Sequence, residues 1–269
     1  METLLVPVDF SENSVDATRY AVALSSQLGI AGIVLYHSNI FGDKPESDIL
    51  TELEKLKKEL NRESKVAITC VANSVPLSEG IADLIIRHRA SIIVMGIRGR
   101  NKVGQKLIGS HVFQVSKSAT VPVLIVPEQS VFSKIEHAAL ALPIIAELKK
   151  YIPYEAIKSL IKKLGATLMV LNISKIRDKT PKPIVYAGLA DTLDMFDDMS
   201  PTYHFFSARN TADGIAHFAK DNHAQLLISV AGDYGFLQGM FRSSVTRKLA
   251  YQSTVPLLIC RSGNETIEN

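Results

Sequence analysis

The 269-residue chain is long enough for about two domains, and its 46% hydrophobic and 21% charged residues are typical of globular proteins. A formal net charge of +3, from 30 basic and 27 acidic residues, is too small to indicate nucleic-acid binding by bulk charge. The only two cysteines, Cys70 and Cys260, stand in strand-like apolar runs. This usage indicates buried free thiols in a reducing compartment and no cysteine metal site.

The chain carries no signal for export or for a membrane. The N-terminus lacks the basic and apolar segments of a signal peptide, and no apolar run approaches the ~18 residues needed to span a bilayer. We therefore expect a cytoplasmic protein with neither membrane nor nucleic-acid partners.

Apolar runs and amphipathic segments alternate along the first half of the chain. Five short apolar runs predict buried strands at 3–8, 33–37, 65–71, 92–95 and 121–126. Helical spacing and capping signals predict helices at 14–28, 46–62, 80–88 and 110–118. We interpret the Lys/Glu face of the second helix as plain solvated surface. Strands that are apolar throughout and alternate with helices predict a parallel α/β sheet covered on both faces.

The second half repeats the first. Gly80-Ile81-Ala82 recurs as Gly214-Ile215-Ala216, and the run 120–125 recurs at 254–259 with the same displacement. We predict two tandem five-stranded, Rossmann-like domains of strand order 3-2-1-4-5, at residues 1–128 and 135–262. We expect them to be related by pseudo-two-fold symmetry.

The stretch that follows the fourth predicted strand carries a glycine motif. It reads Gly96-Ile97-Arg98-Gly99, nine further residues, and Gly109-Ser110, where a helix begins. Glycines let a polyanion approach the backbone closely, and a helix start offers unpaired N–H groups to phosphate. The basic side chains in the stretch would add positive charge or remain solvated; they are Arg98, Arg100, Lys102 and Lys106.

Asp9 is the second candidate. It follows the first strand as Gly96 follows the fourth. These two strands are neighbours in a 3-2-1-4-5 sheet, so the two residues would lie close together. Ligands of such sheets bind beyond the carboxyl ends of the strands, at the topological switch point. Alternatively, Asp9 only caps the following helix, for which Ser11 and Ser14 also provide capping side chains. We interpret His37, at the end of the second strand, as packed or hydrogen-bonded rather than as a ligand.

The Gly-x2-Gly-x9-Gly-Ser pattern, the Val-Pro-Val-Asp-Phe-Ser start and the strand ending Tyr36-His37-Ser38 resemble the universal stress protein family. This resemblance covers the whole chain and implies a stress-response protein that binds ATP or AMP, with Mg²⁺ as an option. It implies that the two fifth strands, at 121–126 and 255–259, pair within one chain as an intramolecular pseudo-dimer. It also implies that Pro7, Val8 and Asp9 line the adenine and ribose end. Ser38 occupies an adenine-contacting position that is usually apolar. Phosphates would lie on the glycine motif, at Gly96, Arg98, Gly99, Gly109 and Ser110.

The second domain lacks these residues. In the ungapped alignment Asp9 falls on Pro143, Gly96 on Val230, Gly99 on Asp233 and Gly109 on Ser243. A valine does not reach positive φ cheaply, and an aspartate repels phosphate. We therefore expect the second domain to be a structural or regulatory partner without nucleotide.

Three functions remain open from the sequence. The first is a nucleotide-binding module that acts on an unidentified protein partner, either as a single chain or as a homodimer. The second is a slow nucleotide hydrolase, for which no catalytic or metal-binding set can be assembled. The third is an interaction scaffold that works without nucleotide.

Overall fold

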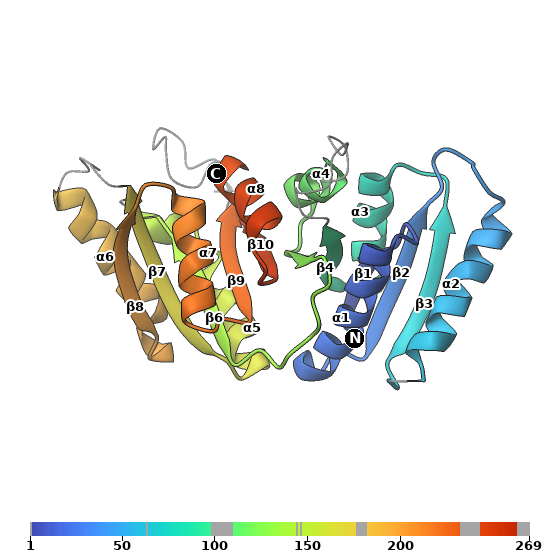
Figure 1. Cartoon of the computed structure of the whole chain (residues 1–269), viewed down its shortest axis with the longest axis horizontal. Helices are drawn as coiled ribbons and strands as arrows, with labels where there is room; N and C mark the ends of the chain where they lie inside the picture. Colours follow the sequence, from blue (N-terminus) through green and yellow to red (C-terminus); the bar gives the residue numbers. More distant parts are fainter. Residues whose placement is uncertain are drawn as a thin grey trace, which may run out of the picture. The chain divides into compact units, whose positions relative to one another are not determined.

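The computed structural model in Figure 1 describes residues 2–62, 64–97, 110–143, 145, 147–175, 182–231 and 243–262. The chain divides into two compact units, unit 1 over Met1–Lys134 and unit 2 over Ile135–Asn269. Unit 1 runs from blue to green in Figure 1, and unit 2 runs from green-yellow to red. Each unit is an α/β fold with a parallel sheet.

Unit 1 has the predicted strand order, β3-β2-β1-β4-β5, and all of its strand pairs are parallel. Right-handed crossovers place α1 and α2 on one face of the sheet and α3 and α4 on the other. The elements are β1 (Thr3–Pro7), α1 (Glu12–Leu28), β2 (Gly32–Ser38), α2 (Glu46–Leu60), β3 (Ala67–Asn73), α3 (Leu77–His88), β4 (Ala90–Ile97), α4 (Ser110–Ser118) and β5 (Val123–Pro127).

Unit 2 repeats this topology with the order β8-β7-β6-β9-β10. It differs after its first strand, where a short 3-10 helix, η1, precedes the first α-helix. The elements are β6 (His137–Leu142), η1 (Leu148–Lys150), α5 (Tyr154–Leu164), β7 (Thr167–Lys175), α6 (Lys182–Phe196), η2 (Asp197–Met199), β8 (Thr202–Ala208), α7 (Thr211–Asp221), β9 (Leu226–Ala231), α8 (Ser243–Gln252) and β10 (Leu257–Arg261).

The first helices of the two units end alike. Gly29 closes α1 and Gly165 closes α5, each in the left-handed conformation at φ 66 and φ 63. Glycine adopts this conformation without the steric penalty that a side chain brings, and so it ends helices here. The repeat detected in the sequence is therefore also a repeat of local structure.

Buried strands form the core of each unit, as continuous apolar runs predict for parallel sheets. Leu4, Leu5 and Val6 of β1 are fully buried, and so is Leu140 at the centre of β6. Burial of each such side chain contributes about 1.5–3 kcal/mol relative to its exposure to water. The central strand of each unit thus anchors the loops that follow it.

A tight contact joins β2 to α3 in unit 1. The side chain of Tyr36 is fully buried, and its hydroxyl donates to Asn73 Oδ1 at 2.8 Å. A Cβ on Gly80 of α3 would lie only 2.5 Å from Tyr36 Cζ. Gly80 therefore lets α3 pack against the phenol ring. The hydrogen bond from the Tyr36 hydroxyl to Asn73 joins β2 to β3 near their carboxyl ends.

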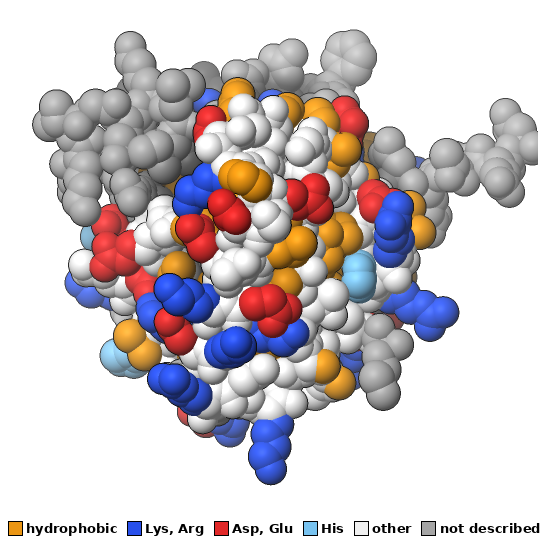
Figure 2. Space-filling model, turned by 90° about the vertical axis from the view of Figure 1, so that its right-hand side faces the viewer, with side chains coloured by type: hydrophobic (Ala, Val, Ile, Leu, Met, Phe, Trp, Pro, Cys, Tyr) orange, Lys and Arg blue, Asp and Glu red, His pale blue; other side chains and the backbone are white. Residues whose placement is uncertain are grey.

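The surface that carries α2 is mixed in charge, as the sequence predicted. Figure 2 looks onto this side of unit 1 and shows Lys and Arg side chains interspersed with Asp and Glu. Two of the ion pairs here are Lys44 with Glu52 at 2.7 Å and Lys57 with Glu54 at 3.1 Å. Exposed pairs of this kind contribute little to stability, about 0–1 kcal/mol each.

Both cysteines are free, and Cys260 is buried, as predicted. The prediction that both thiols are buried was wrong for Cys70, which is half-buried. Cys70 lies on β3, the outer strand of unit 1, and an outer strand has a neighbour on one side only. Burial and the nearby Glu54 carboxylate raise the pKa of the Cys70 thiol to about 12.

Candidate functional site

Residues that follow two neighbouring strands form the candidate site. β1 and β4 are paired in parallel, with Leu5 opposite Ile93, so their carboxyl ends lie at one edge of the sheet. Asp9 comes two residues after the end of β1, and Gly96 lies at the end of β4. This edge between β1 and β4 is the topological switch point, where ligands of open α/β sheets bind.

Asp9 holds the turn between β1 and α1. Its Oδ1 accepts hydrogen bonds from the Ser11 backbone N–H at 3.0 Å and from the Ser11 hydroxyl at 2.5 Å. Desolvation alone would raise the pKa of the Asp9 carboxyl, but the hydrogen bonds from Ser11 and Ser14 lower this pKa below its ordinary value of 3.8. Asp9 is exposed and ionised at neutral pH, so it can accept hydrogen bonds from ligand hydroxyls.

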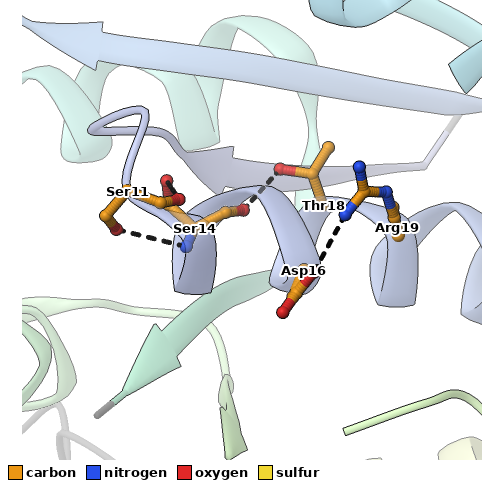
Figure 3. Close-up of polar contacts among 5 residues, drawn as sticks. All are labelled: Ser11, Ser14, Asp16, Thr18 and Arg19. Atoms are coloured by element: carbon orange, nitrogen blue, oxygen red, sulfur yellow. Dashed lines mark hydrogen bonds and ion pairs between the residues drawn. The ribbon is translucent and has the colours of Figure 1, made fainter. Parts of the chain in front are cut away.

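The start of α1 beside it is built by two serines, shown in Figure 3. Ser11 is the N-cap, and its hydroxyl accepts from the Ser14 N–H at 3.4 Å. The Ser14 carbonyl in turn accepts from the Thr18 hydroxyl at 2.7 Å. The predicted capping region is confirmed, and Ser11 rather than Asp9 fills the cap position. Asp9 supports that cap through Ser11.

Gly96 lets the first turn of α1 approach β4 closely. A Cβ at this position would lie within contact distance of the Asn13 carbonyl oxygen, 2.8 Å from the carbonyl carbon and 3.2 Å from Asn13 Cβ. No side chain fits there without displacing backbone. The glycine thus keeps β4 and the N-terminal turn of α1 in direct contact at the mouth of the site.

Sequence reasoning missed Asn13. Its side chain is 7% exposed, and it has no hydrogen-bond partner among the residues that the structure describes. Buried carboxamides are normally hydrogen-bonded, so an unpartnered one at a candidate site is notable. The sequence does carry a signal for it, because Asn13 stands one helical turn before Ala17, on the buried side of α1.

His37 at the end of β2 and Phe10 in the turn between β1 and α1 lie beside the same region. The His37 Nδ1 lies 2.7 Å from the carbonyl oxygen of Val8 and must donate to it, since a carbonyl only accepts. The His37 ring stacks on Phe10 at a centroid distance of 5.2 Å, and Phe10 has a positive φ of 59. The interpretation of His37 as a hydrogen-bonded, packed residue is consistent with these contacts.

The other residues expected at the adenine end are half-buried or already hydrogen-bonded within the protein. Pro7 ends β1 and is half-buried. Val8 is 3% exposed, and both of its backbone groups bond to β2, its N–H to the Tyr36 carbonyl at 2.8 Å and its carbonyl to His37. The Ser38 hydroxyl donates to the Val75 carbonyl at 2.7 Å. Ser38 is therefore held at the end of β2 by the loop that follows β3.

Part of the glycine motif lies outside the described residues. Arg98, Gly99 and Gly109 belong to this part, as do Arg100, Lys102 and Lys106. The two ends of the motif are described, because Gly96 lies in β4 and Ser110 is the first residue of α4. A helix start therefore follows the motif, as the sequence predicted.

Unit 2 has a different residue at the position of Gly96. Gly96 pairs with Val126 in unit 1, and Val230 pairs with Cys260 at the matching register in unit 2. The alignment of Gly96 with Val230 is thus consistent with the sheet. Val230 is 1% exposed, so a buried valine side chain stands where unit 1 has Gly96.

The connection after the first strand also differs between the two units. In unit 1, α1 begins at Glu12, shortly after β1 ends at Pro7. In unit 2, β6 ends at Leu142, and α5 begins only at Tyr154, after η1. Pro143 follows β6 where Asp9 stands in the alignment, Asp233 lies outside the described residues, and Ser243 begins α8.

The described part of the chain gives no sign of a metal centre or a membrane span. No group of three or more His, Cys, Asp or Glu side chains among the described residues could hold a metal ion. None of the described helices is both long and apolar enough to cross a bilayer.

Comparison with known proteins gives the family. The model of the Universal stress protein family matches residues 1–127. A universal stress protein of Thermus aquaticus is 32% identical over an alignment of 139 positions, which covers 46% of this chain and 98% of the relative. The chain belongs to the universal stress protein family. The resemblance noted in the sequence is thereby confirmed.

Two further members of the family match almost the whole chain. Universal stress protein Slr1230 of Synechocystis sp. is 22% identical over an alignment of 293 positions, which covers 97% of this chain and all of the relative. The crystal structure of a universal stress protein from Archaeoglobus fulgidus superposes with a TM-score of 0.67 at 18% identity and covers 97% of each chain. The protein is therefore a tandem universal stress protein with two α/β units.

Proposed function

We propose that unit 1 binds an adenine nucleotide, ATP or AMP, and that unit 2 is its structural or regulatory partner without nucleotide. The observation that carries this proposal is the contact between Gly96 and the first turn of α1. It brings the end of β4, which leads into the glycine motif, against a helix start that follows Asp9. A polyanion at this edge meets free backbone N–H groups and the positive end of a helix dipole.

The roles of the residues follow from their chemistry. The Asp9 carboxylate accepts hydrogen bonds from ribose hydroxyls, and Pro7, Val8 and Ser38 border the base. Gly96, Arg98, Gly99, Gly109 and Ser110 hold the phosphates through backbone N–H groups, the Ser110 hydroxyl and the Arg98 charge. Mg²⁺ that accompanies ATP would be held mainly by phosphate oxygens and water, with at most one or two carboxylates.

The difference between the two units supports a single nucleotide per chain. Val230 replaces Gly96, and Pro143 replaces Asp9, so unit 2 lacks both the close approach and the ribose acceptor. In this proposal the chain acts in the stress response through an unidentified protein partner, and the nucleotide in unit 1 changes the affinity for that partner.

The test is the nucleotide content of the gently purified chain, followed by calorimetric titration with ATP, AMP and adenosine. We expect about one adenine nucleotide per chain, and loss of binding in a folded Gly109→Val variant because the side chain fills the phosphate approach. The matched variant in unit 2, Ser243→Val, should bind as the wild type does. Two nucleotides per chain would contradict the role of unit 2, and no binding at all would leave the scaffold function.

A further inference from the structure

We propose that the Asn13 carboxamide is a phosphate ligand of unit 1, and that it binds the phosphate attached directly to the ribose. This inference rests on the proposed function and adds to it a residue outside the glycine motif. The starting observation is that Asn13 is 7% exposed and without a hydrogen-bond partner among the described residues. A carboxamide that makes no hydrogen bond to these residues is available to a ligand or to an ordered water.

The direction of the side chain follows from helix geometry. Cα–Cβ bonds of an α-helix tilt toward its N-terminus. Asn13 stands in the first turn of α1, and its Cβ lies against Gly96 at the end of β4. The carboxamide therefore leans past Gly96, toward the edge of the sheet from which the glycine motif departs.

The neighbours of Asn13 define the chemistry of the ligand. The N–H groups of Glu12 and Asn13 have no hydrogen-bond partner among the described residues, as is usual in the first turn of a helix. These N–H groups and the Asn13 Nδ2 are all donors, and the helix dipole adds positive potential. A phosphate supplies the matching set of acceptor oxygens.

The position along the site identifies the phosphate. Asn13 lies one turn beyond Asp9, the proposed ribose acceptor, and directly against Gly96, where the glycine motif for the outer phosphates begins. A donor between the ribose acceptor and the start of the glycine motif would contact the phosphate that links the ribose to the outer phosphates. AMP and ATP share this group, and adenosine lacks it.

The experiment compares Asn13→Leu with the wild type by calorimetric titration with adenosine, AMP and ATP. Leucine keeps the branched shape of the side chain and removes its donors. We expect AMP and ATP to bind about tenfold more weakly or worse, as for a lost hydrogen bond to a charged group, with adenosine unchanged. Asn13→Asp should weaken AMP and ATP further, because its carboxylate repels phosphate.

Controls separate this inference from the proposed function. Asn61→Leu, at the exposed end of α2, should leave all three affinities unchanged. If the wild type binds AMP and Asn13→Leu binds it equally well, or if Asn13→Leu weakens adenosine as much as AMP, the assignment of Asn13 is wrong while the nucleotide site stands. If the wild type binds none of the three ligands, the proposed function itself fails and takes this inference with it.

Discussion

Gly96 at the end of β4 lies directly against Asn13 in the first turn of α1, with no space for a side chain between them. The contact is backbone on backbone, because a Cβ at position 96 would lie 2.8 Å from the Asn13 carbonyl carbon. Rotation of a side chain therefore cannot relieve a clash here. The contact sets how α1 starts, and through Asp9 and Ser11 it sets the shape of the candidate site.

Substitution of Gly96 tests this contact. We expect Gly96→Ala to lower the free energy of unfolding by about 1–3 kcal/mol, the range typical of overpacked cores. Gly32→Ala is the matched control, since its Cβ would meet the Thr3 side-chain methyl at 2.9 Å, and that methyl can move. Urea denaturation followed by circular dichroism measures both. Equal losses for the two variants would argue against the backbone contact.

The Asp9 turn gives a pH dependence of stability. Because the folded pKa of Asp9 lies below the ordinary 3.8, the carboxylate stabilises the fold above that pH, and this contribution is lost as the pH falls through the folded pKa. Asp9→Asn should therefore be less stable than the wild type at pH 7, and the difference should shrink below pH 3.8.

Melting temperatures of the two proteins between pH 7 and pH 3 measure this convergence. Asp16→Asn is the control, because Asp16 makes an exposed ion pair with Arg19 at 2.9 Å on the same helix (Figure 3) and does not bond the turn. A wild-type advantage over Asp9→Asn that stays constant down to pH 3 would show that the Ser11 hydrogen bonds do not favour the ionised carboxylate.

The buried carboxamide of Asn172, in β7 of unit 2, is the target of a substitution that we expect to be stabilising. Asn172 is 1% exposed, and neither its amide nitrogen nor its amide oxygen has a hydrogen-bond partner among the described residues. Asn172→Leu keeps the branched shape of the side chain and removes two unpaired polar atoms, so we expect a gain of about 1–2 kcal/mol in the free energy of unfolding. Urea denaturation measures it.

Asn73→Leu is the opposite control for this test. The Asn73 Oδ1 accepts from the Tyr36 hydroxyl at 2.8 Å and from the Val75 N–H at 3.3 Å, so its loss leaves donors unpaired and should destabilise. A loss of stability in Asn172→Leu as well would indicate that its amide has partners in solution.

The reactivity of Cys70 should respond to the charges beside it. Burial and the Glu54 carboxylate raise the pKa of this thiol to about 12, and Lys57 lowers it. The thiolate is the reactive form, and each unit of pKa changes its fraction at pH 8 about tenfold. In a Cys260→Ala background, Glu54→Gln should therefore speed alkylation by iodoacetamide, and Lys57→Gln should slow it. Mass spectrometry over time measures the rates, and identical rates would contradict the coupling to Glu54.

The sequence predicted the topology because topology depends on patterns that are local in the chain. Continuous apolar strands alternating with helices led to the strand order of unit 1, and from that order to the meeting of Asp9 with Gly96 at one edge.

Features that depend on packing between distant segments could not be predicted. The Asn13 carboxamide reads as an ordinary first-turn residue until β4 is placed against it. The half-burial of Cys70 depends on β3 being an outer strand, with a neighbour on one side only. In each case the deciding neighbour lies far away in the sequence.

The connection after β6 also limits how unit 2 can be redesigned. A Val230→Gly substitution would remove the side chain. It would not create the contact that Gly96 makes in unit 1, because the first α-helix of unit 2 begins only at Tyr154 and does not follow β6 directly. A nucleotide site grafted onto unit 2 would have to bring the short turn of residues 8–12 in place of residues 143–153. Single substitutions in unit 2 would create cavities without creating a nucleotide site. This is a barrier both for protein engineering and for an evolutionary return to nucleotide binding.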